Sequence, residues 1–471
     1  MTLTSDPARA GRTPAPLVAP GGVDRPSPAA RDVPAAGRAA PPAGGRTMAG
    51  YLLVPRPGDA FKALLIPCAF LLGVLGAGGT DPRTVLRAAV VLLAVELLIY
   101  PARYQWNDVR GFAADQRHPS AKDRGRLPGP LERGREHILA SCAVAAARLA
   151  LVAGLVLALP QLHLGPLLAL AAVAVFGVAA VYEWLRSAGT GRSEQVPAPL
   201  RPAVVAIWLA VGAGYAVRGL IGLGLALGLA DRPVLAVAAT VALWAYGIGF
   251  VTSRWAVEAT AFCVLRGGEP VWTVQAQHAR EHLTALVRWL PARAEHVADG
   301  TPGADWAPLR GRTSPLAPWN LAFVVAGGAA ALTGWEFSPP GAAWPPAAAV
   351  AVGGALLTLA VVVAPPRARR VVTGAGALLL LVGVVLLGSA TPSAASVVAV
   401  LPWLVVMLAY VTATRNSLST MGSWARPLTR PVGAALGALA RWVVGSSAWE
   451  LVHPPAPVAG DAPDAGPRGP R

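Results

Sequence analysis

Long apolar runs separated by polar connections dominate the sequence between about residue 60 and residue 414. A helix needs about 20 apolar residues, at 1.5 Å per residue, to cross the hydrocarbon core of a bilayer. Runs near this length, each bounded by Pro, Gly or charged residues, therefore predict transmembrane helices and an all-α fold. Ten spans are predicted, near residues 60–78, 84–103, 138–159, 165–183, 203–228, 233–252, 318–334, 345–364, 371–388 and 396–414.

Positive charge lies mainly on one side of these predicted spans. Alternate connections, starting with the one after the second span, hold seven, three, seven and three Arg or Lys residues, whereas the opposite connections hold only Arg83 and Arg232. Cytoplasmic loops are enriched in Lys and Arg, so this bias assigns the basic side to the cytoplasm. We predict a multi-pass protein of the cell membrane with both termini in the cytoplasm. The basic connections are residues 104–136, 184–201, 253–317 and 365–370.

The composition agrees with a polytopic membrane protein. Hydrophobic residues make up 54% of the chain and charged residues 14%, which excludes a soluble domain of this length. The formal net charge of +16 is explained by loop arginines and anionic headgroups, so nucleic acid is not an expected partner. Cys68, Cys142 and Cys263 are far apart in the sequence and lack metal-binding spacing.

The sequence predicts three regions. An N-terminal tail rich in Ala, Pro, Gly and Arg should be disordered in the cytoplasm, and the C-terminal tail should be largely unstructured apart from a possible interfacial helix at 431–447. The regions are the N-terminal tail at 1–48, the transmembrane domain at 49–414 with long loops at 104–136 and 253–317, and the C-terminal tail at 415–471.

Acidic residues follow the second predicted span, in the segment WNDVRGFAADQRHPSAKDRGRLPG. If the helix continues past Tyr104, Asp108 and Asp115 are seven residues apart and share one face, about 10 Å from each other. Asn107 lies beside them, and such oxygen ligands suit Mg²⁺, which is usually shared with phosphate. The alternative is a solvated loop whose acids pair with its arginines. Basic residues that could neutralise phosphate here are Arg110, Arg117, Lys122, Arg124 and Arg126.

The segment NDVRGFAADQRHP, followed by RLPG, resembles the first signature of the UbiA superfamily of intramembrane prenyltransferases, NDxxDxxxD with an Arg/Pro-rich stretch. Its wording is most similar to the branch that includes decaprenyl-phosphate phosphoribosyltransferase. Gly111 stands where the family has its middle Asp, and the second loop has no Asp between Asp231 and Asp299. Weaker similarities follow in family order: RP at Arg56, YEWLR at Tyr182–Arg186, GYAVRG around Arg218, and SRWAVE at Ser253–Glu258.

The resemblance implies a membrane bundle of about nine or ten helices around a lipid-accessible cavity. It implies a Mg²⁺-dependent transferase that moves a prenyl or phosphoribosyl group to or from a polyprenyl lipid, with an isoprenoid (di)phosphate and a small-molecule acceptor or donor as partners. The resemblance assigns catalysis to Asp108 and Asp115, and metal binding to Asn107, Asp108 and Asp115. It assigns phosphate binding to Arg110, Arg117, Lys122, Arg124, Arg186, Arg218 and Arg254. Glu258 is the candidate residue of the second loop.

Other interpretations stay open at this point. A terpene cyclase of the same fold would ionise a prenyl diphosphate without an acceptor, and a degenerate, non-catalytic homologue would only bind lipid. Gly111 and the missing DxxxD motif favour the latter. Arg218 could bind phosphate or fix helix packing through an acid such as Glu96. The HxxEH sequence at His278–His282 is expected to be part of a cytoplasmic helix rather than a zinc site.

Overall fold

The computed structural model describes residues 47–56, 62–118, 125–192, 195–294, 297–337, 344–388 and 394–421, with scattered positions between 431 and 445. The predictions for residues 1–46 and for most of 422–471 lie outside these described residues. The first helix, α1 (Met48–Leu53), begins at the last residue of the predicted N-terminal tail. The described positions between 431 and 442 are helical, and their placement at a membrane surface stays a prediction.

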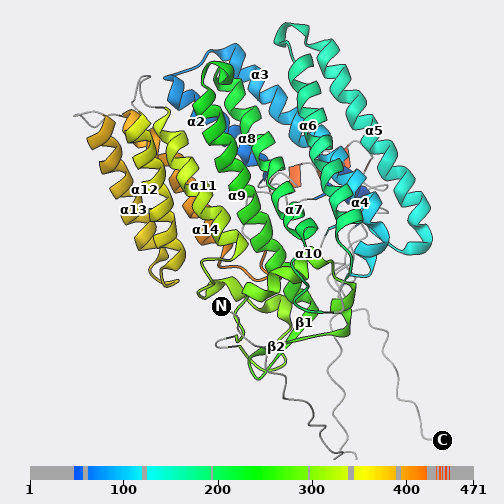
Figure 1. Ribbon diagram of the computed structural model, residues 1–471. Helices are drawn as coiled ribbons and strands as arrows, with labels where there is room; N and C mark the ends of the chain where they lie inside the picture. The colour runs from blue at the N-terminus through cyan, green and yellow to red at the C-terminus, as the bar shows by residue number, and fades with distance from the viewer. Residues whose placement is uncertain are drawn as a thin grey trace, which may run out of the picture. The chain divides into compact units, whose positions relative to one another are not determined.

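Helices account for most of the described chain, as the apolar runs predict (Figure 1). The second predicted span is one continuous helical segment, α3 (Pro82–Leu93), a π-helical turn (Ala94–Ile99) and α4 (Tyr100–Gln116). The other elements up to the long second loop are α2 (Leu65–Ala77), α5 (Gly134–Ala158), α6 (Gly165–Trp184) with a π-helical end (Leu185–Gly189), α7 (Pro202–Ala210), α8 (Ala213–Ala226) and α9 (Pro233–Ala259).

The long second loop contains the described strands, β1 (Cys263–Arg266) and β2 (Glu269–Trp272), followed by the short helix α10 (Glu281–Thr284). The strands form an antiparallel hairpin in which Arg266 pairs with Glu269. Its two-residue turn, Gly267 and Gly268, has φ angles of 57° and 77°, which glycine adopts without steric cost. The remaining helices are α11 (Pro318–Trp335), α12 (Trp344–Val363), α13 (Arg369–Gly388) and α14 (Ala394–Ala413).

Eight helices in the described part of the chain are long and apolar enough to cross a membrane. The prediction of nine or ten spans is therefore not confirmed, although each of the ten apolar runs contains helix. The first run forms α2, whose 13 residues reach only about 20 Å. The seventh run forms α11, which is 18 residues long but starts with Pro, Trp and Asn, and these lower its hydropathy.

Local sequence signals explain where several helices begin and end. The Asp81 carboxylate accepts a hydrogen bond of 3.0 Å from the backbone N–H of Thr84 and caps α3, whose first residue is Pro82. Gly78 ends α2 in the left-handed conformation with φ at 77°, which a residue with a side chain rarely adopts. Proline also starts α7, α9 and α11, where its missing N–H leaves no helical hydrogen bond unmade.

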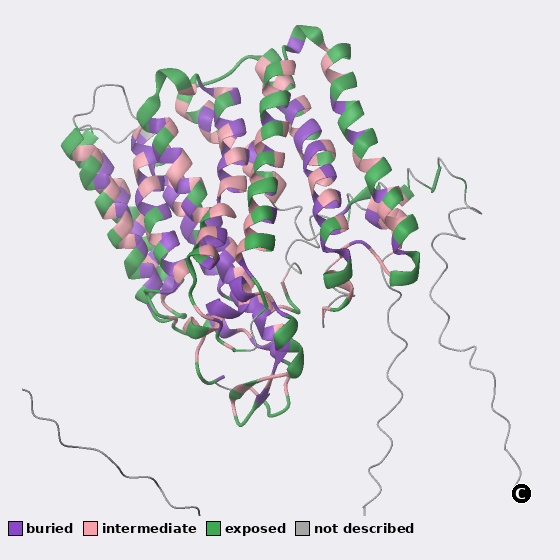
Figure 2. Ribbon diagram, turned by 45° about the vertical axis from the view of Figure 1, so that its right-hand side comes forward, coloured by how far each residue is buried: buried purple, intermediate pink, exposed green. Residues whose placement is uncertain are grey.

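Two apolar cores lie on different sides of α9. One is formed by α3 to α6 and α8, and includes Val91, Ile99 and Val175. The other is formed by α9 and α11 to α14, and includes Trp335 and Trp403. Figure 2 shows buried residues facing neighbouring helices and exposed residues facing outward along most helices. That exposed apolar surface suits contact with lipid.

The hairpin, α10 and the rest of residues 260–317 lie beyond one end of the helices (Figure 1). We call this end of the helices the loop end. The end of α14 reaches it, because the backbone N–H of Ser419 donates to the carbonyl of Ala304 at 3.1 Å. The start of α13 also reaches it, through a 3.1 Å hydrogen bond from Arg369 to the carbonyl of Gly311.

Candidate functional site

Helix α4 carries the first polar motif, so Asp108 and Asp115 do lie on one continuous helix. Asn107 and Asp108 are buried, while Asp115 is half-buried. The Asp115 side chain bends back toward Gly111: a Cβ atom placed on Gly111 would lie 3.2 Å from Oδ2 of Asp115. Gly111 therefore provides the space in which the Asp115 carboxylate lies.

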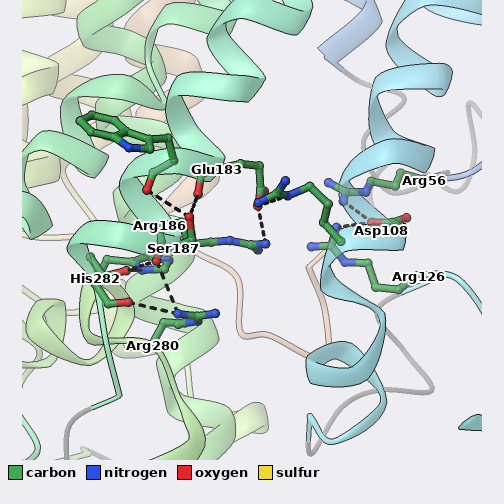
Figure 3. A network of polar contacts seen from close by, with 11 residues as sticks. Arg56, Asp108, Arg126, Glu183, Arg186, Ser187, Arg280 and His282 are labelled. Carbon is green, nitrogen blue, oxygen red and sulfur yellow. Dashed lines mark hydrogen bonds and ion pairs between the residues drawn. The ribbon is translucent and has the colours of Figure 1, made fainter.

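Asp108 is the centre of a buried ion cluster (Figure 3). Its Oδ1 atom accepts hydrogen bonds from Arg56 and, at 3.1 Å, from Arg126. Its Oδ2 atom accepts one from the Tyr51 hydroxyl at 3.3 Å. Burial and the Asp108 charge raise the pKa of Tyr51, so its hydroxyl remains a donor. Asp108 thus fixes two guanidinium groups that come from distant parts of the sequence.

Glu183, at the end of α6, is the centre of a second ion cluster. It is 2% exposed, accepts a 2.6 Å hydrogen bond from Arg186 and lies 3.5 Å from Nε of Arg110. With the Asn107 amide oriented for hydrogen bonding, its nitrogen donates to Glu183 and its oxygen accepts from Arg56 at 2.5 Å. Asn107 therefore joins the Asp108 and Glu183 clusters instead of standing free as a metal ligand.

Arg103 adds a further cation to this region. Its guanidinium lies 5.3 Å from the Tyr104 ring centroid, on which Arg56 also lies, at 4.8 Å. Arg103 forms no ion pair with a carboxylate among the described residues. A cation within a candidate membrane span is costly unless an anion or water compensates it, so Arg103 is well suited to a ligand with negative charge.

We call Arg56, Arg103, Arg110, Arg126 and Arg186 the arginine cluster. Its members come from four parts of the chain: Arg56 and Arg126 contact Asp108, Arg110 and Arg186 contact Glu183, and Arg103 lies with Arg56 against the Tyr104 ring. Among the described residues, Asp108 and Glu183 are the acids that pair with them. The excess of positive charge suits an anion such as phosphate or diphosphate.

Both π-helical segments of the described chain adjoin these charged residues. One contains Glu96 and leads into α4, and the other contains Arg186 and ends α6. A π-turn rotates the residues that follow it relative to a regular helix, and such turns are frequent at functional sites. Here they determine which face of α4 and of the α6 end carries the polar residues.

Arg218 belongs to a separate buried pair. Its Nε donates to Glu96 at 2.7 Å and its Nη2 donates to the Tyr104 hydroxyl at 3.2 Å. Its guanidinium carbon lies 3.3 Å from the Tyr100 ring centroid. Of the two interpretations of Arg218, helix packing through Glu96 is therefore the one the contacts favour. Arg148 is likewise committed, to Gln105 and to the carbonyls of Leu52 and Leu53.

The two long loops meet at the end of α4. Nε2 of His118 lies 3.9 Å from Oε1 of Glu258 on α9, and the His118 ring contacts that of Phe262 with centroids 5.0 Å apart. One turn earlier on α9, Nη1 of Arg254 is buried without a hydrogen-bond partner among the described residues. Glu258 therefore lies beside the end of the first motif, while Arg254 lies over the Phe250 ring on the same helix.

Among the described residues, the other predicted phosphate ligands are not members of the cluster. Arg117 is exposed at the end of α4, and Lys122 and Arg124 lie outside the described residues. Arg126 is one of the basic residues that the sequence predicts to neutralise phosphate, whereas the motif residues give no role to Arg56, Arg103 or the acid Glu183. Glu183 is the acid of the YEWLR segment, so its place beside Arg186 was the available signal.

The described residues do not form a magnesium site as arranged. Both oxygens of Asp108 accept hydrogen bonds from Arg56, Arg126 and Tyr51, and its side chain is fully buried. Within the described chain, no group of three or more His, Cys, Asp and Glu side chains could hold a metal ion. Mg²⁺ usually takes carboxylate oxygens that are free to share it with phosphate. Magnesium therefore remains a prediction from sequence alone.

The HxxEH residues have structural contacts instead of metal-binding geometry. Glu281 accepts a 3.0 Å hydrogen bond from the backbone N–H of Gly191, and the His282 ring lies 4.7 Å from that of Trp255. Burial, together with Arg186 and Arg280, lowers the pKa of His282 to about 3, so the ring is neutral. Figure 3 shows His282 and Arg280 below Arg186, where Arg280 donates to the Thr190 carbonyl at 3.1 Å.

Comparisons with protein-family models, with curated proteins and with solved structures find no match to this chain. The similarity to the UbiA superfamily thus depends on the motif residues themselves.

Proposed function

We propose that the chain is a multi-pass protein of the cell membrane and a UbiA-type transferase that acts at the phosphate end of an isoprenoid lipid, with the loop end in the cytoplasm. The arginine cluster is the observation that carries this proposal. Five arginines converge around the buried acids Asp108 and Glu183. The side chains of Arg56 and Arg186 are only 12% and 20% exposed, and such largely buried cations are costly without a compensating anion. A lipid (di)phosphate supplies both the anion and the apolar chain that this environment suits.

Asp108 and Glu183 act in this proposal as positioning residues. Each carboxylate holds two guanidinium groups, Asp108 those of Arg56 and Arg126, and Glu183 those of Arg110 and Arg186. A carboxylate uses only part of the donor set of each guanidinium, which leaves other N–H groups for phosphate oxygens. Arg103, which has no carboxylate of its own, contributes a further positive charge.

The arginines would favour departure of diphosphate. As the C–O bond of the prenyl group breaks, its electron pair stays on the diphosphate oxygen, and fixed cations stabilise the charge that develops there. The acceptor then forms the new bond to the allylic carbon and loses a proton. In a phosphoribosyl version, the departing diphosphate belongs to the ribosyl donor, and an oxygen of the lipid phosphate forms the new bond.

The test measures diphosphate release from prenyl diphosphates of several chain lengths by the purified chain in lipid vesicles, with and without candidate acceptors. Replacing Arg126 and Arg186 together by Gln should lower the rate roughly 100-fold, because charge stabilisation at the leaving group is lost. Arg133→Gln is the matched control, since Arg133 is exposed and lies outside the cluster. Equal rates in the two variants would contradict the proposal. Cyclic products without an acceptor would identify a terpene cyclase.

A non-catalytic lipid-binding protein is a second candidate. It is favoured because both carboxylate oxygens of Asp108 already accept hydrogen bonds from side chains, and because no metal-binding group is found in the described residues. The same vesicles separate the two candidates. Binding without catalysis would be supported by two results together. Prenyl diphosphate would bind to the wild-type chain, more weakly to the variant that lacks Arg126 and Arg186, and neither protein would cleave it.

A further inference from the structure

A second cationic site lies away from the arginine cluster, where α13 begins and α14 ends. A cavity of about 640 Å³ is found there. Arg370 and Arg415 provide its positive charge, and Leu408 and Val411 provide its apolar surface. It is also lined by Thr373, Thr412 and Asn416. This site is thus part apolar and part cationic.

Among the described residues, the two arginines of this site have no acidic partner. Arg370 and Arg415 are both exposed, and neither forms an ion pair or a side-chain hydrogen bond within the described residues. The sequence explains this, because there is no Asp or Glu between Glu336 and Glu450. The neighbouring Arg369 differs, since it is 3% exposed and donates to Thr414 and to the carbonyl of Gly311. One arginine of the pair Arg369 and Arg370 is therefore structural, and the other faces the cavity.

The position of the cavity places it at a membrane surface. Both flanking helices belong to the eight candidate spans, Arg369–Gly388 and Ser396–Ala413, and the cavity lies where one begins and the other ends. Its apolar residues, Leu408 and Val411, lie within the second of these spans, while Arg415 follows it. The gradient from apolar to cationic thus runs along α14, in the direction from acyl chains to headgroups.

We infer that this cavity binds the headgroup of an anionic phospholipid, with its phosphate between Arg370 and Arg415 and the start of an acyl chain against Leu408 and Val411. Basic pockets between membrane helices on the cytoplasmic side recognise such headgroups, and the basic connections assign the loop end to that side. Thr373, Thr412 and Asn416 add donors for phosphate or glycerol oxygens. The inference is independent of the proposed transferase activity.

The proposed headgroup site is tested by measuring lipid binding to the purified full-length chain in neutral detergent. Native mass spectrometry and titration would compare phosphatidylglycerol with phosphatidylcholine. Arg370→Ala with Arg415→Ala should weaken phosphatidylglycerol binding roughly tenfold or more and leave phosphatidylcholine binding unchanged. Arg367→Ala is the matched control, because Arg367 is exposed in the same connection but does not line the cavity. Equal binding by the double variant and this control would overturn the inference.

Two further variants distinguish a defined binding cavity from general attraction of anionic lipid to positive charge. Arg370→Lys with Arg415→Lys keeps the charge and should retain most of the binding. Thr412→Trp keeps both arginines but fills the cavity from an exposed position, and it should abolish the preference for phosphatidylglycerol. Retained preference in Thr412→Trp would overturn the inference. Inorganic phosphate should compete poorly because it lacks an acyl chain; competition as strong as that of the lipid would show a soluble-anion site instead.

Discussion

The two sides of α9 differ in what their helices bury. On one side, α4 to α6 and α8 bury Asp108, Arg148, Glu183 and Arg218 within or beside membrane-length helices. On the other, α11 to α14 bury tryptophans and close glycine contacts, and their one buried charged residue among those described is Arg369, at the loop end. Charges within membrane spans are costly and usually functional, so we expect the proposed diphosphate binding on the first side, while the buried residues of the second side serve packing.

The supporting side depends on tight packing. Gly334 on α11 leaves no room for a side chain against the Ala399 carbonyl of α14, and Gly354 on α12 faces Ala331 of α11 equally closely. Small residues of this kind let membrane helices approach each other, where packing and hydrogen bonds replace the hydrophobic effect. Mutations of the buried residues on this side should therefore change stability and leave diphosphate binding at the arginine cluster of the folded protein unchanged.

The largest expected effect is that of Trp403→Ala. Trp403 is fully buried, and its Nε1 donates to the Gly354 carbonyl at 3.0 Å and to Thr358 Oγ1 at 2.9 Å. Its loss should lower the free energy of unfolding by about 3–5 kcal/mol, measured by thermal unfolding in detergent. Trp344→Ala is the control, because Trp344 is 79% exposed. A similar loss in both variants, or weaker diphosphate binding by folded Trp403→Ala protein, would break the division between the two sides.

Asp108→Asn tests the other side. The substitution leaves Arg56 and Arg126 without their shared carboxylate and should cost about 3–5 kcal/mol of unfolding free energy. Added diphosphate should then raise the unfolding temperature of the variant more than that of the wild type, because the anion replaces the lost charge. Asp231→Asn, at an exposed position, should respond like the wild type. No extra stabilisation of Asp108→Asn would mean that anions do not reach the cluster.

Gly111→Asp has the smallest expected effect and tests the role of magnesium. The new Cβ would lie 3.2 Å from Oδ2 of Asp115, and the second carboxylate would repel the first, so the free energy of unfolding should fall by about 1 kcal/mol. Mg²⁺ alone should stabilise this variant but not the wild type, because a second carboxylate beside Asp115 supplies further oxygen ligands.

Gly111→Asn is the matched control for this change, since it has the same shape without the charge. Thermal unfolding with and without Mg²⁺ measures the response. Equal stabilisation of wild type and Gly111→Asp by Mg²⁺ would instead support the magnesium site predicted from the sequence.

The helices were predictable from sequence because apolar composition determines them locally. The same is true of the long loop after α9 and of the shared helix for Asp108 and Asp115. The number of spans was harder to predict, because α2 begins only at Leu65 within the predicted run at 60–78, and α11 starts with Pro, Trp and Asn. Both features depend on single residues at the ends of runs, which a count of apolar residues does not resolve.

The site was only partly predictable, because its contacts join distant parts of the chain. The sequence places Arg110, Arg117, Lys122, Arg124 and Arg126 near the first motif by proximity. Of these, Arg126 does pair with Asp108, but the other partner is Arg56, which precedes α2. Likewise, the spacing of Asp108 and Asp115 suggests a pair of metal ligands. It carries no information about which basic side chains contact them in the folded protein. Arg103 was missed since it lies inside an apolar run and has no motif of its own.

The short helix α2 has a consequence for the surrounding bilayer. Its 13 residues cover about 20 Å, whereas a hydrocarbon core is about 30 Å thick, and Leu71 and Leu75 on it are exposed. Lipids beside α2 must therefore thin locally or let water approach its ends, at a cost of fractions of a kcal/mol per Å. The chain thus brings the aqueous surface closer to the bilayer centre at α2 than along its longer helices, which suits a protein whose substrate would have one end in water and the other in lipid.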